Sequence, residues 1–277
     1  MTTWHAMTPA AHDFLAAAAA DPRAVLVAMD FDGTLAPIVD DPETSAMQPE
    51  AAEALALLGP KVGHLAILTG RPVAKVRQLG QLERRAGLDG VVVLGQYGAE
   101  RWDARTGVET PPETPQSVAV ATVQIGRALA DLGLPGVHVE DKGQAVGVHV
   151  RRCPDPVAAF AALKPVLARI ADDNGLVLEP GKHVLELRSS STTKGDALRA
   201  LLAETGATVV AMCGDDLGDL PAFDLLRELR DDGLATCVVV SGSHELPALT
   251  DHADVVADGP AGVAAWLAAV SRHLGNN

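Results

Sequence analysis

Residues 25–35 read VLVAMDFDGTL, and this stretch decides the fold. Its first part, Val25–Met29, is apolar without polar alternation, which is typical of a strand covered on both faces in a parallel sheet. Asp30 and Asp32 follow, so two carboxylates stand at the carboxyl end of a buried strand. Because ligands of open α/β sheets bind outside that end, we expect a site there.

The turn after this strand has the chemistry of an anion site. Gly33 permits a tight turn that brings backbone N–H groups close to an anion, and Thr34 adds a hydroxyl donor. A buried carboxylate is costly unless a metal ion or a charged partner compensates it. A bare Asp-x-Asp more often only caps a turn, but the whole hexapeptide after a buried strand favours a site for phosphate and a hard cation.

The hexapeptide DFDGTL resembles the first motif of the haloacid dehalogenase superfamily of phosphohydrolases, which has the form Asp-x-Asp-Gly-Thr-Leu. The resemblance implies that three further motifs follow in a fixed order along the chain. It also implies a Rossmann-like core that carries all four motifs on its strand ends.

The second motif requires a Ser or Thr at a strand end, and His64–Leu68 runs directly into Thr69, Gly70 and Arg71. We expect the Thr69 hydroxyl to hold phosphoryl oxygens, with Gly70 and Arg71 as substrate-binding residues. The alternative for Thr69 is an N-cap of the helix expected near Pro72. That role is compatible with phosphate binding, because a helix N-terminus attracts anions.

The third and fourth motifs require a cation and an acidic cluster. Lys194 begins an expected helix, where the helix dipole disfavours a cation, so we expect it to neutralise charge at the phosphate rather than to be a solvated surface lysine. Asp215 and Asp216 follow an apolar run, with Asp219 close behind. Acids so near one another repel unless they share a cation. Since Asp-rich turns are common, we take Asp215 as the metal ligand.

The resemblance also implies a mechanism. Asp30 is the expected nucleophile, and Asp32 is the expected acid and base that protonates the leaving sugar oxygen and then deprotonates water. Thr69 and Lys194 complete the expected catalytic set. The expected cofactor is Mg²⁺, bound by the Asp30 carboxylate, the Asp32 backbone carbonyl and Asp215.

Composition limits the class of protein. The chain has 277 residues, 48% of them hydrophobic and 3% aromatic, which predicts one or two domains with a core of Ala, Val and Leu. A net charge of −14 argues against nucleic acid or an anionic membrane as a partner. Cys153, Cys213 and Cys237 are widely spaced without a Cys-x-x-Cys pair, so they indicate neither a disulfide framework nor a zinc site.

Targeting signals are not apparent in the sequence. The N-terminal apolar stretch lacks the basic segment of a signal peptide, and charges or prolines interrupt every apolar run before it reaches the length of a membrane span. We therefore expect a cytoplasmic protein without a membrane partner, a monomer or a weak dimer, whose partner is a small-molecule sugar phosphate.

Strand-like and helical patterns alternate over most of the chain, which predicts a doubly wound parallel sheet, a Rossmann-like α/β core. The middle differs. Residues 111–115, PPETP, indicate a hinge, and helix, strand, strand then occurs twice, which predicts helices on one face of an antiparallel sheet. We expect a core formed by residues 1–112 and 189–277, with an inserted α+β cap domain at 113–188. The expected core strands are Val25–Met29, His64–Leu68, 91–94, 208–212 and 236–240, the expected core helices are Pro49–Leu58, 72–79 and 194–204, and the expected cap elements are helices 118–132 and 155–172 with strands 137–140, 145–151, 176–179 and 183–188.

Polar stretches of the inserted domain resemble the caps of trehalose-6-phosphate phosphatases: VEDKG at 139–143, HVR at 149–151, GK at 181–182 and ELR at 186–188. Residues 30–42 and 95–100 resemble the same family. The resemblance implies that the cap selects the sugar, with Glu140, Lys182 and Glu186 as substrate-binding residues, because charge-assisted hydrogen bonds to hydroxyls are strong. A solvated sheet face is the alternative for each of them.

Two departures from the family pattern bear on the substrate. Ser189 stands where a Pro is usual, and LGDLP at 217–221 replaces an acidic tail that contains Thr. The expected activity is Mg²⁺-dependent hydrolysis of trehalose 6-phosphate. The alternatives are a phosphatase of sucrose 6-phosphate or of a glycosylated phosphoglycerate, and a sugar-phosphate-binding module without catalysis.

Overall fold

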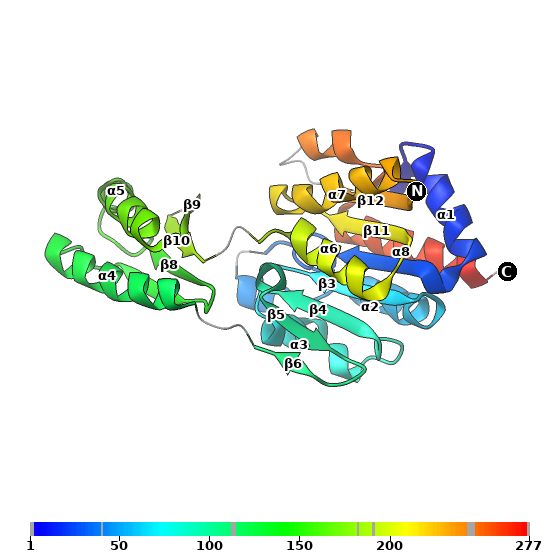
Figure 1. The fold of residues 1–277 in the computed structure, drawn as a ribbon, viewed down its shortest axis with the longest axis horizontal. Helices are drawn as coiled ribbons and strands as arrows, with labels where there is room; N and C mark the ends of the chain where they lie inside the picture. Colours follow the sequence, from blue (N-terminus) through cyan, green and yellow to red (C-terminus); the bar gives the residue numbers. More distant parts are fainter. Residues whose placement is uncertain are drawn as a thin grey trace. The chain divides into compact units, whose positions relative to one another are not determined.

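The computed structural model describes residues 3–39, 41–111, 115–181, 183–189, 192–242 and 247–275 (Figure 1). The chain forms two compact units, one of Met1–Thr110 with Thr192–Asn277 and the other of Pro111–Ser191. The smaller unit is therefore an insertion in the sequence of the larger one. Among the described residues, no helix combines the length and the apolarity that a bilayer crossing requires.

The larger unit is built on one sheet, nine-stranded in the described residues. In sheet order its strands are β1 (Trp4–Ala6), β13 (Val255–Asp258), β12 (Ala235–Gly242), β11 (Val209–Gly214), β2 (Val25–Met29), β3 (His64–Leu68), β4 (Val91–Gly95), β5 (Glu100–Asp103) and β6 (Glu109–Thr110). The strands from β13 to β4 are parallel, and β1, β5 and β6 pair antiparallel at the two edges. All of β2 is buried, as expected for a central strand covered on both faces.

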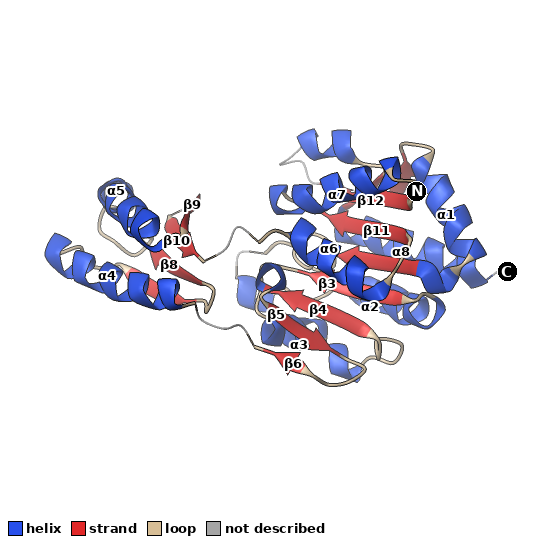
Figure 2. Ribbon diagram, in the orientation of Figure 1, coloured by secondary structure: helices blue, strands red, loops and turns tan. Residues whose placement is uncertain are grey.

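Helices cover both faces of this sheet (Figure 2). One face carries α1 (Ala10–Ala20), α2 (Pro49–Leu58), α3 (Val73–Gly80) and α8 (Gly259–Gly275), and the other carries α6 (Lys194–Thr205) and α7 (Leu220–Asp231). Alternate residues of β2 serve the two cores: Val25, Val27 and Met29 pack on the first face, Leu26 and Ala28 on the second. This is the predicted doubly wound α/β fold, and the fold class is confirmed.

Element boundaries follow the sequence patterns closely in the centre of the sheet and less well at its edges. β2, β3 and α2 begin and end at the predicted residues, and α6 extends one residue further. The edge strands β1, β5 and β6 were not predicted. β5 reads ERWD, with Glu100 and Trp102 buried and Arg101 and Asp103 half-buried, so its strand character comes from its neighbours rather than from an apolar run.

In its described residues the smaller unit has a four-stranded antiparallel sheet and two helices. Its strands in order are β7 (His138–Asp141), β8 (Ala145–His149), β10 (Val184–Arg188) and β9 (Val177–Gly181), and its helices are α4 (Gln116–Leu132) and α5 (Pro156–Asn174). Val146, Val148 and Leu185 are buried with residues of both helices. On the other face of this sheet, Glu140 of β7 and Glu186 of β10 both pair with Gly147 of β8, one from each side. Charged side chains therefore share the face that the helices leave open.

Candidate active site

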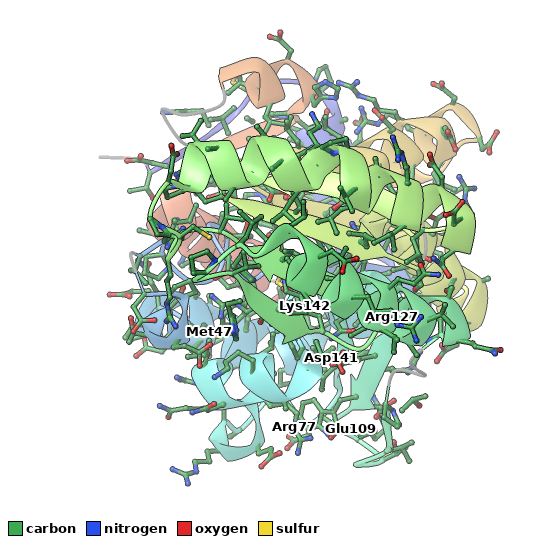
Figure 3. All side chains as sticks on the ribbon, turned by 90° about the vertical axis from the view of Figure 1, so that its left-hand side faces the viewer. Met47, Arg77, Glu109, Arg127, Asp141 and Lys142 are labelled. Carbon is green, nitrogen blue, oxygen red and sulfur yellow. The ribbon has the colours of Figure 1, made fainter. Side chains whose placement is uncertain are left out.

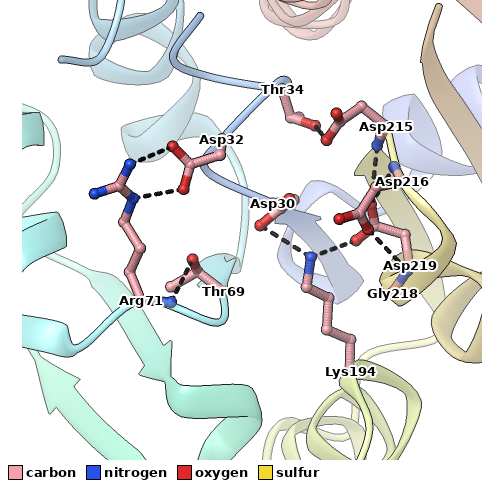
Figure 4. Close-up of polar contacts among 10 residues, drawn as sticks. All are labelled: Asp30, Asp32, Thr34, Thr69, Arg71, Lys194, Asp215, Asp216, Gly218 and Asp219. Atoms are coloured by element: carbon pink, nitrogen blue, oxygen red, sulfur yellow. Dashed lines mark hydrogen bonds and ion pairs between the residues drawn. The ribbon is translucent and has the colours of Figure 1, made fainter. Parts of the chain in front are cut away.

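Three polar side chains follow the carboxyl ends of neighbouring parallel strands. Asp30 follows β2, Thr69 follows β3 and Asp215 follows β11. Met29 pairs with Cys213 in the register of β2 and β11, and the Asp30 N–H donates to the Cys213 carbonyl at 2.8 Å. Because these central strands end together, the three side chains meet at the carboxyl end of the sheet, as Figure 4 shows.

Lys194 reaches the same end of the sheet from the start of α6. Its Nζ lies 3.0 Å from Asp30 Oδ1 and 2.7 Å from Asp219 Oδ1. The Lys194 side chain is 3% exposed and that of Asp219 is 0% exposed. Burial alone would lower the pKa of Lys194, but the carboxylates of Asp30 and Asp219 outweigh it and raise that pKa. Lys194 is therefore a permanent cation between two buried acids.

The helix that carries Lys194 has its own start signal. Thr193 is the N-cap of α6, and its N–H donates to Asp196 Oδ2 at 2.9 Å while its Oγ1 accepts from the Asp196 N–H at 3.2 Å. This reciprocal capping box satisfies two amide groups at the helix start. It fixes the residue at which α6 begins, and with it the place of Lys194.

Asp219 belongs to the site, although the sequence analysis did not select it. Its Oδ2 accepts from the N–H groups of Asp215 at 2.9 Å and Asp216 at 3.1 Å, and its Oδ1 accepts from Lys194. Burial raises the pKa of Asp219, and Lys194 opposes that rise. The available signal was the spacing: an acid four positions after Asp215, directly before a helix with Pro221 in its first turn.

Asp215 lies against the turn of the first motif. The Thr34 hydroxyl donates to Asp215 Oδ1 at 3.4 Å. A Cβ on Gly33, whose φ is +69°, would lie 1.9 Å from Asp215 Oδ2, so only glycine leaves room for this carboxylate. Burial, together with the charges of Asp219 and Asp216, raises the pKa of Asp215 to about 7.

This acidic group has the donor set of a hard-cation site. One oxygen from each of Asp30, Asp215 and Asp219 lies within 4.8 Å of the others. Burial raises the pKa of Asp30 well above its usual value, although the charge of Lys194 opposes the rise. The three acids therefore carry more negative charge than Lys194 compensates, and a divalent cation, which prefers oxygen ligands, would supply the missing positive charge. Since the oxygens of Asp219 already accept from Lys194 and two backbone N–H groups, Asp30 and Asp215 have the greater capacity for a metal.

Asp32 is held apart from this group by Arg71. The guanidinium binds both carboxylate oxygens, with Nε 2.5 Å from Oδ2 and Nη2 2.7 Å from Oδ1. The buried Ser45 hydroxyl lies 3.3 Å from Asp32 Oδ1 and donates to the Pro37 carbonyl at 2.6 Å. The hydrogen bonds to Asp32 raise the pKa of Arg71 against the effect of its burial. The predicted acid and base is thus a carboxylate in a two-point ion pair.

Thr69 is buried at the start of the loop that leads to α3. Its Oγ1 accepts from the Arg71 N–H at 3.1 Å, and a Cβ on Gly70 would lie 2.9 Å from the Tyr97 hydroxyl oxygen. The Arg71 N–H therefore binds the Thr69 hydroxyl within the loop, and the absence of a side chain at Gly70 leaves room for the Tyr97 hydroxyl. Such a loop suits phosphoryl oxygens.

Sequence comparison identifies the family of this chain. Residues 28–253 match the family Trehalose-phosphatase, a span that includes every site residue described above. The chain belongs to the trehalose-phosphatase family. It is 31% identical over 222 residues to a probable trehalose-phosphate phosphatase of Sinorhizobium fredii, covering 78% of this chain and 79% of the relative. It is also 31% identical over 274 residues to the trehalose-phosphate phosphatase of Mycobacterium tuberculosis strain H37Rv, covering 91% of this chain but only 62% of that protein.

Solved structures share the fold of this chain. The C-terminal domain of the Candida albicans trehalose-6-phosphate phosphatase has a TM-score of 0.69 at 21% identity, covering 97% of this chain and 99% of that one. A haloacid dehalogenase-like hydrolase from Bacteroides thetaiotaomicron has a TM-score of 0.66 at 14% identity, covering 88% and 98%. At these identities the likeness shows the fold, a haloacid dehalogenase-like core.

In this member of the trehalose-phosphatase family the predicted sugar-binding residues lie in the smaller unit. Lys142 Nζ lies 2.6 Å from Glu186 Oε2 and 3.9 Å from Glu140 Oε2. His149 Nε2 lies 2.8 Å from the same Glu140 oxygen. The structure thus links Glu140 and Glu186 through one lysine on the open face of the small sheet. Lys182, the third predicted residue, lies outside the described residues.

Proposed function

We propose that this chain hydrolyses trehalose 6-phosphate to trehalose and inorganic phosphate at the carboxyl end of the larger sheet, where Asp30 lies. Membership of the trehalose-phosphatase family and the names of its relatives support the substrate. One observation carries the reaction type: Lys194 Nζ lies 3.0 Å from Asp30, buried between that carboxylate and Asp219. A buried cation at a candidate nucleophile suits the transfer of a dianionic phosphoryl group.

In the proposed first step an Asp30 oxygen attacks phosphorus, and the bond between phosphorus and the sugar oxygen breaks. Asp32 gives its proton to that leaving oxygen, so neutral trehalose and an aspartyl-phosphate are formed. Asp32 is an ion-paired carboxylate in the structure, so this step requires that it leave Arg71 and take up a proton first.

In the proposed second step Asp32, now a carboxylate, takes a proton from water, and the water oxygen attacks the phosphorus of the aspartyl-phosphate. The bond between phosphorus and the Asp30 oxygen breaks, which releases phosphate and regenerates the Asp30 carboxylate. Asp32 keeps the proton for the next turnover. One side chain thus serves as acid and then as base, in agreement with the sequence-based assignment.

The remaining residues supply charge and hydrogen bonds. Thr69, with the N–H of Gly70, would hold the phosphoryl oxygens, and Lys194 would stay charged throughout because its pKa is raised. Asp30, Asp215 and the Asp32 carbonyl would hold Mg²⁺, which when bound supplies positive charge that reduces the repulsion between carboxylate and phosphate.

We assign sugar recognition to the smaller unit. Glu140, Lys182 and Glu186 are the proposed contacts to the glucosyl hydroxyls, because ionised groups form strong hydrogen bonds with hydroxyls. The compact unit Pro111–Ser191 supports a separate cap close to the predicted boundaries of 113 and 188. The charged face that its helices leave open supports a polar ligand.

The test is phosphate release from trehalose 6-phosphate, sucrose 6-phosphate, a glycosylated phosphoglycerate and glucose 6-phosphate, with and without a metal chelator. We expect turnover of trehalose 6-phosphate well above the others, lost with chelator. Asp30→Asn should lower that turnover at least ~1000-fold with an unchanged circular dichroism spectrum. Asp13→Asn, at an exposed position of α1, is the matched control. Comparable turnover of glucose 6-phosphate would contradict the substrate, and near-wild-type activity of Asp30→Asn would contradict the nucleophile.

A further inference from the structure

We propose that Glu100 is a positioning residue for the phosphate-binding loop Thr69–Arg71, and that it acts by binding the first backbone N–H of α3. The inference rests on the proposed function of that loop. Glu100 opens β5, next to the corner that joins β4 to β5. It touches neither the acidic group nor Lys194 among the contacts of the described residues, so its action on the phosphate would be indirect.

The corner after β4 binds the loop through the backbone at several successive points. The Thr69 N–H donates to the Leu94 carbonyl at 3.0 Å, and the Thr69 carbonyl accepts from the Tyr97 N–H at 3.0 Å. The Arg71 carbonyl accepts from the Gln96 N–H at 3.0 Å. The loop that carries the candidate phosphate ligands is therefore held by the path of residues 94–97.

This corner keeps an unusual conformation to make those bonds. Gln96 and Tyr97 have φ values of +48° and +59°, and neither is glycine. Two consecutive non-glycine residues in the left-handed region are strained, and such strain persists only where surrounding contacts impose it. At Gly95 a Cβ would lie 2.8 Å from both the Arg71 carbonyl oxygen and the Val73 nitrogen, so the two backbones are in direct contact.

Glu100, which follows this corner in the sequence, adds a side-chain hydrogen bond to the backbone contacts described above. Its Oε2 accepts from the Val73 N–H at 2.5 Å, and Val73 is the first residue of α3. The N-cap position of α3 is Pro72, which gives the helix no side-chain cap among the described contacts. The Glu100 carboxylate supplies that cap from another strand, and its negative charge suits the positive end of the helix.

The burial of Glu100 shows that this cap is kept at a cost. The residue is 9% exposed, and burial raises the pKa of its carboxyl, with the Val73 N–H opposing the rise. None of the described ion pairs involves it. A buried acid whose described partner is one helix N–H fixes the helix start, and the helix start fixes the end of the loop that begins at Thr69.

An acid in the turn directly after the same helix gives a matched comparison. Arg77, one turn after Val73, binds Glu83 and Glu109, and Figure 3 shows Arg77 and Glu109 side by side at the edge of the larger unit. The side chain of Glu83 is 57% exposed. Loss of Glu83 removes an acid that binds α3 through Arg77 and leaves the N-terminus of that helix unchanged.

The test compares Glu100→Asp, which keeps the charge but shortens the reach, with Glu100→Gln, which keeps the reach but removes the charge. Glu83→Gln is the control. The readouts are KM and kcat for trehalose 6-phosphate, the dissociation constant of inorganic phosphate measured by calorimetry with Mg²⁺, and the melting temperature. We expect Glu100→Asp to raise KM and the phosphate dissociation constant about tenfold, because a buried N–H loses its acceptor. Glu100→Gln, whose amide oxygen still reaches Val73, should stay within about threefold of wild type, and so should the control.

A lower melting temperature with unchanged KM and unchanged phosphate binding in Glu100→Asp would mean a structural role alone and would overturn the proposal. Equal losses in Glu100→Asp and Glu100→Gln would also overturn it, because the reach to Val73 would then not matter. Failure of the wild type to release phosphate from trehalose 6-phosphate would refute the proposed function instead. The calorimetric comparison would still decide whether Glu100 positions the loop.

Discussion

The Arg71 guanidinium binds Asp32 at two points, Nε to Oδ2 at 2.5 Å and Nη2 to Oδ1 at 2.7 Å. A carboxylate in such a pair is an acceptor for both oxygens and has no proton to give. Arg71 also follows Thr69 and Gly70, so under the proposed function a phosphate ester at this loop would meet the same guanidinium. We infer that substrate and Asp32 compete for Arg71, and that turnover frees Asp32.

Arg71→Lys should separate charge from geometry. Lysine keeps the positive charge but cannot make the planar two-point contact. We expect KM to rise about tenfold in Arg71→Ala and by a smaller factor in Arg71→Lys, because the phosphate loses one charge-assisted partner. Steady-state kinetics on trehalose 6-phosphate measures both, with exposed Arg84→Ala as the control. An unchanged KM in Arg71→Ala would exclude Arg71 from phosphate binding.

Asp219→Asn tests the residue that sequence reasoning did not select. The change removes one partner of a buried ion pair and leaves Lys194 with Asp30 alone. We expect a loss of about 3 kcal/mol in the free energy of unfolding together with a lower kcat, since the pair is desolvated. Urea denaturation measures the change in the free energy of unfolding. The exposed pair of Arg199 and Glu228 offers the control, because Glu228→Gln should cost less than about 1 kcal/mol.

Metal binding should depend on pH through Asp215. Its pKa is raised from 3.8 to about 7, so between these values the folded metal-free protein binds more protons than the unfolded chain. Stability of the metal-free protein from this group therefore falls as pH rises through that window. A metal must displace the proton below pH 7, so the Mg²⁺-induced rise in melting temperature should be larger at pH 8 than at pH 6. Thermal shift assays at both pH values measure it, and an equal rise at both would contradict the assignment.

Gly33→Ala should damage the site through its side chain more than through its backbone. The new Cβ would lie 1.9 Å from Asp215 Oδ2 and force that carboxylate away. We expect kcat/KM to fall about a hundredfold, as for a reacting group displaced by about 1 Å. Gly107 has the same φ of +69° with no neighbour within 4 Å of its Cβ position, so Gly107→Ala reports the backbone strain alone. Equal losses of activity in the two variants would show that Asp215 is not displaced.

The sequence was sufficient for those parts of the site that depend on local pattern. Asp30, Thr69 and Asp215 each follow an apolar strand, and parallel strands bring their carboxyl ends to one edge, so their meeting could be predicted before any coordinates. Lys194 could be placed by its unfavourable position at a helix start.

Other parts depend on which distant groups meet. The ion pair between Asp32 and Arg71 joins residues that are 39 positions apart in the sequence, and the contact between Glu100 and Val73 joins residues 27 positions apart. No local sequence pattern specifies pairs so widely separated. Asp219 looks like an ordinary turn acid until its burial is known. The antiparallel edge strands were missed for a related reason, since their neighbours in the sheet and not their own composition make them strands.

The capping box of Thr193 and Asp196 has a consequence for how this chain can change. The inserted segment ends at Ser191, and the helix that carries Lys194 begins from contacts within its own first turn. The register of the lysine is thus independent of the length and composition of the segment before it. A different segment could be spliced between Thr110 and Thr192 while the start of α6 kept its own contacts, so under the proposed function the inserted unit could change without moving Lys194.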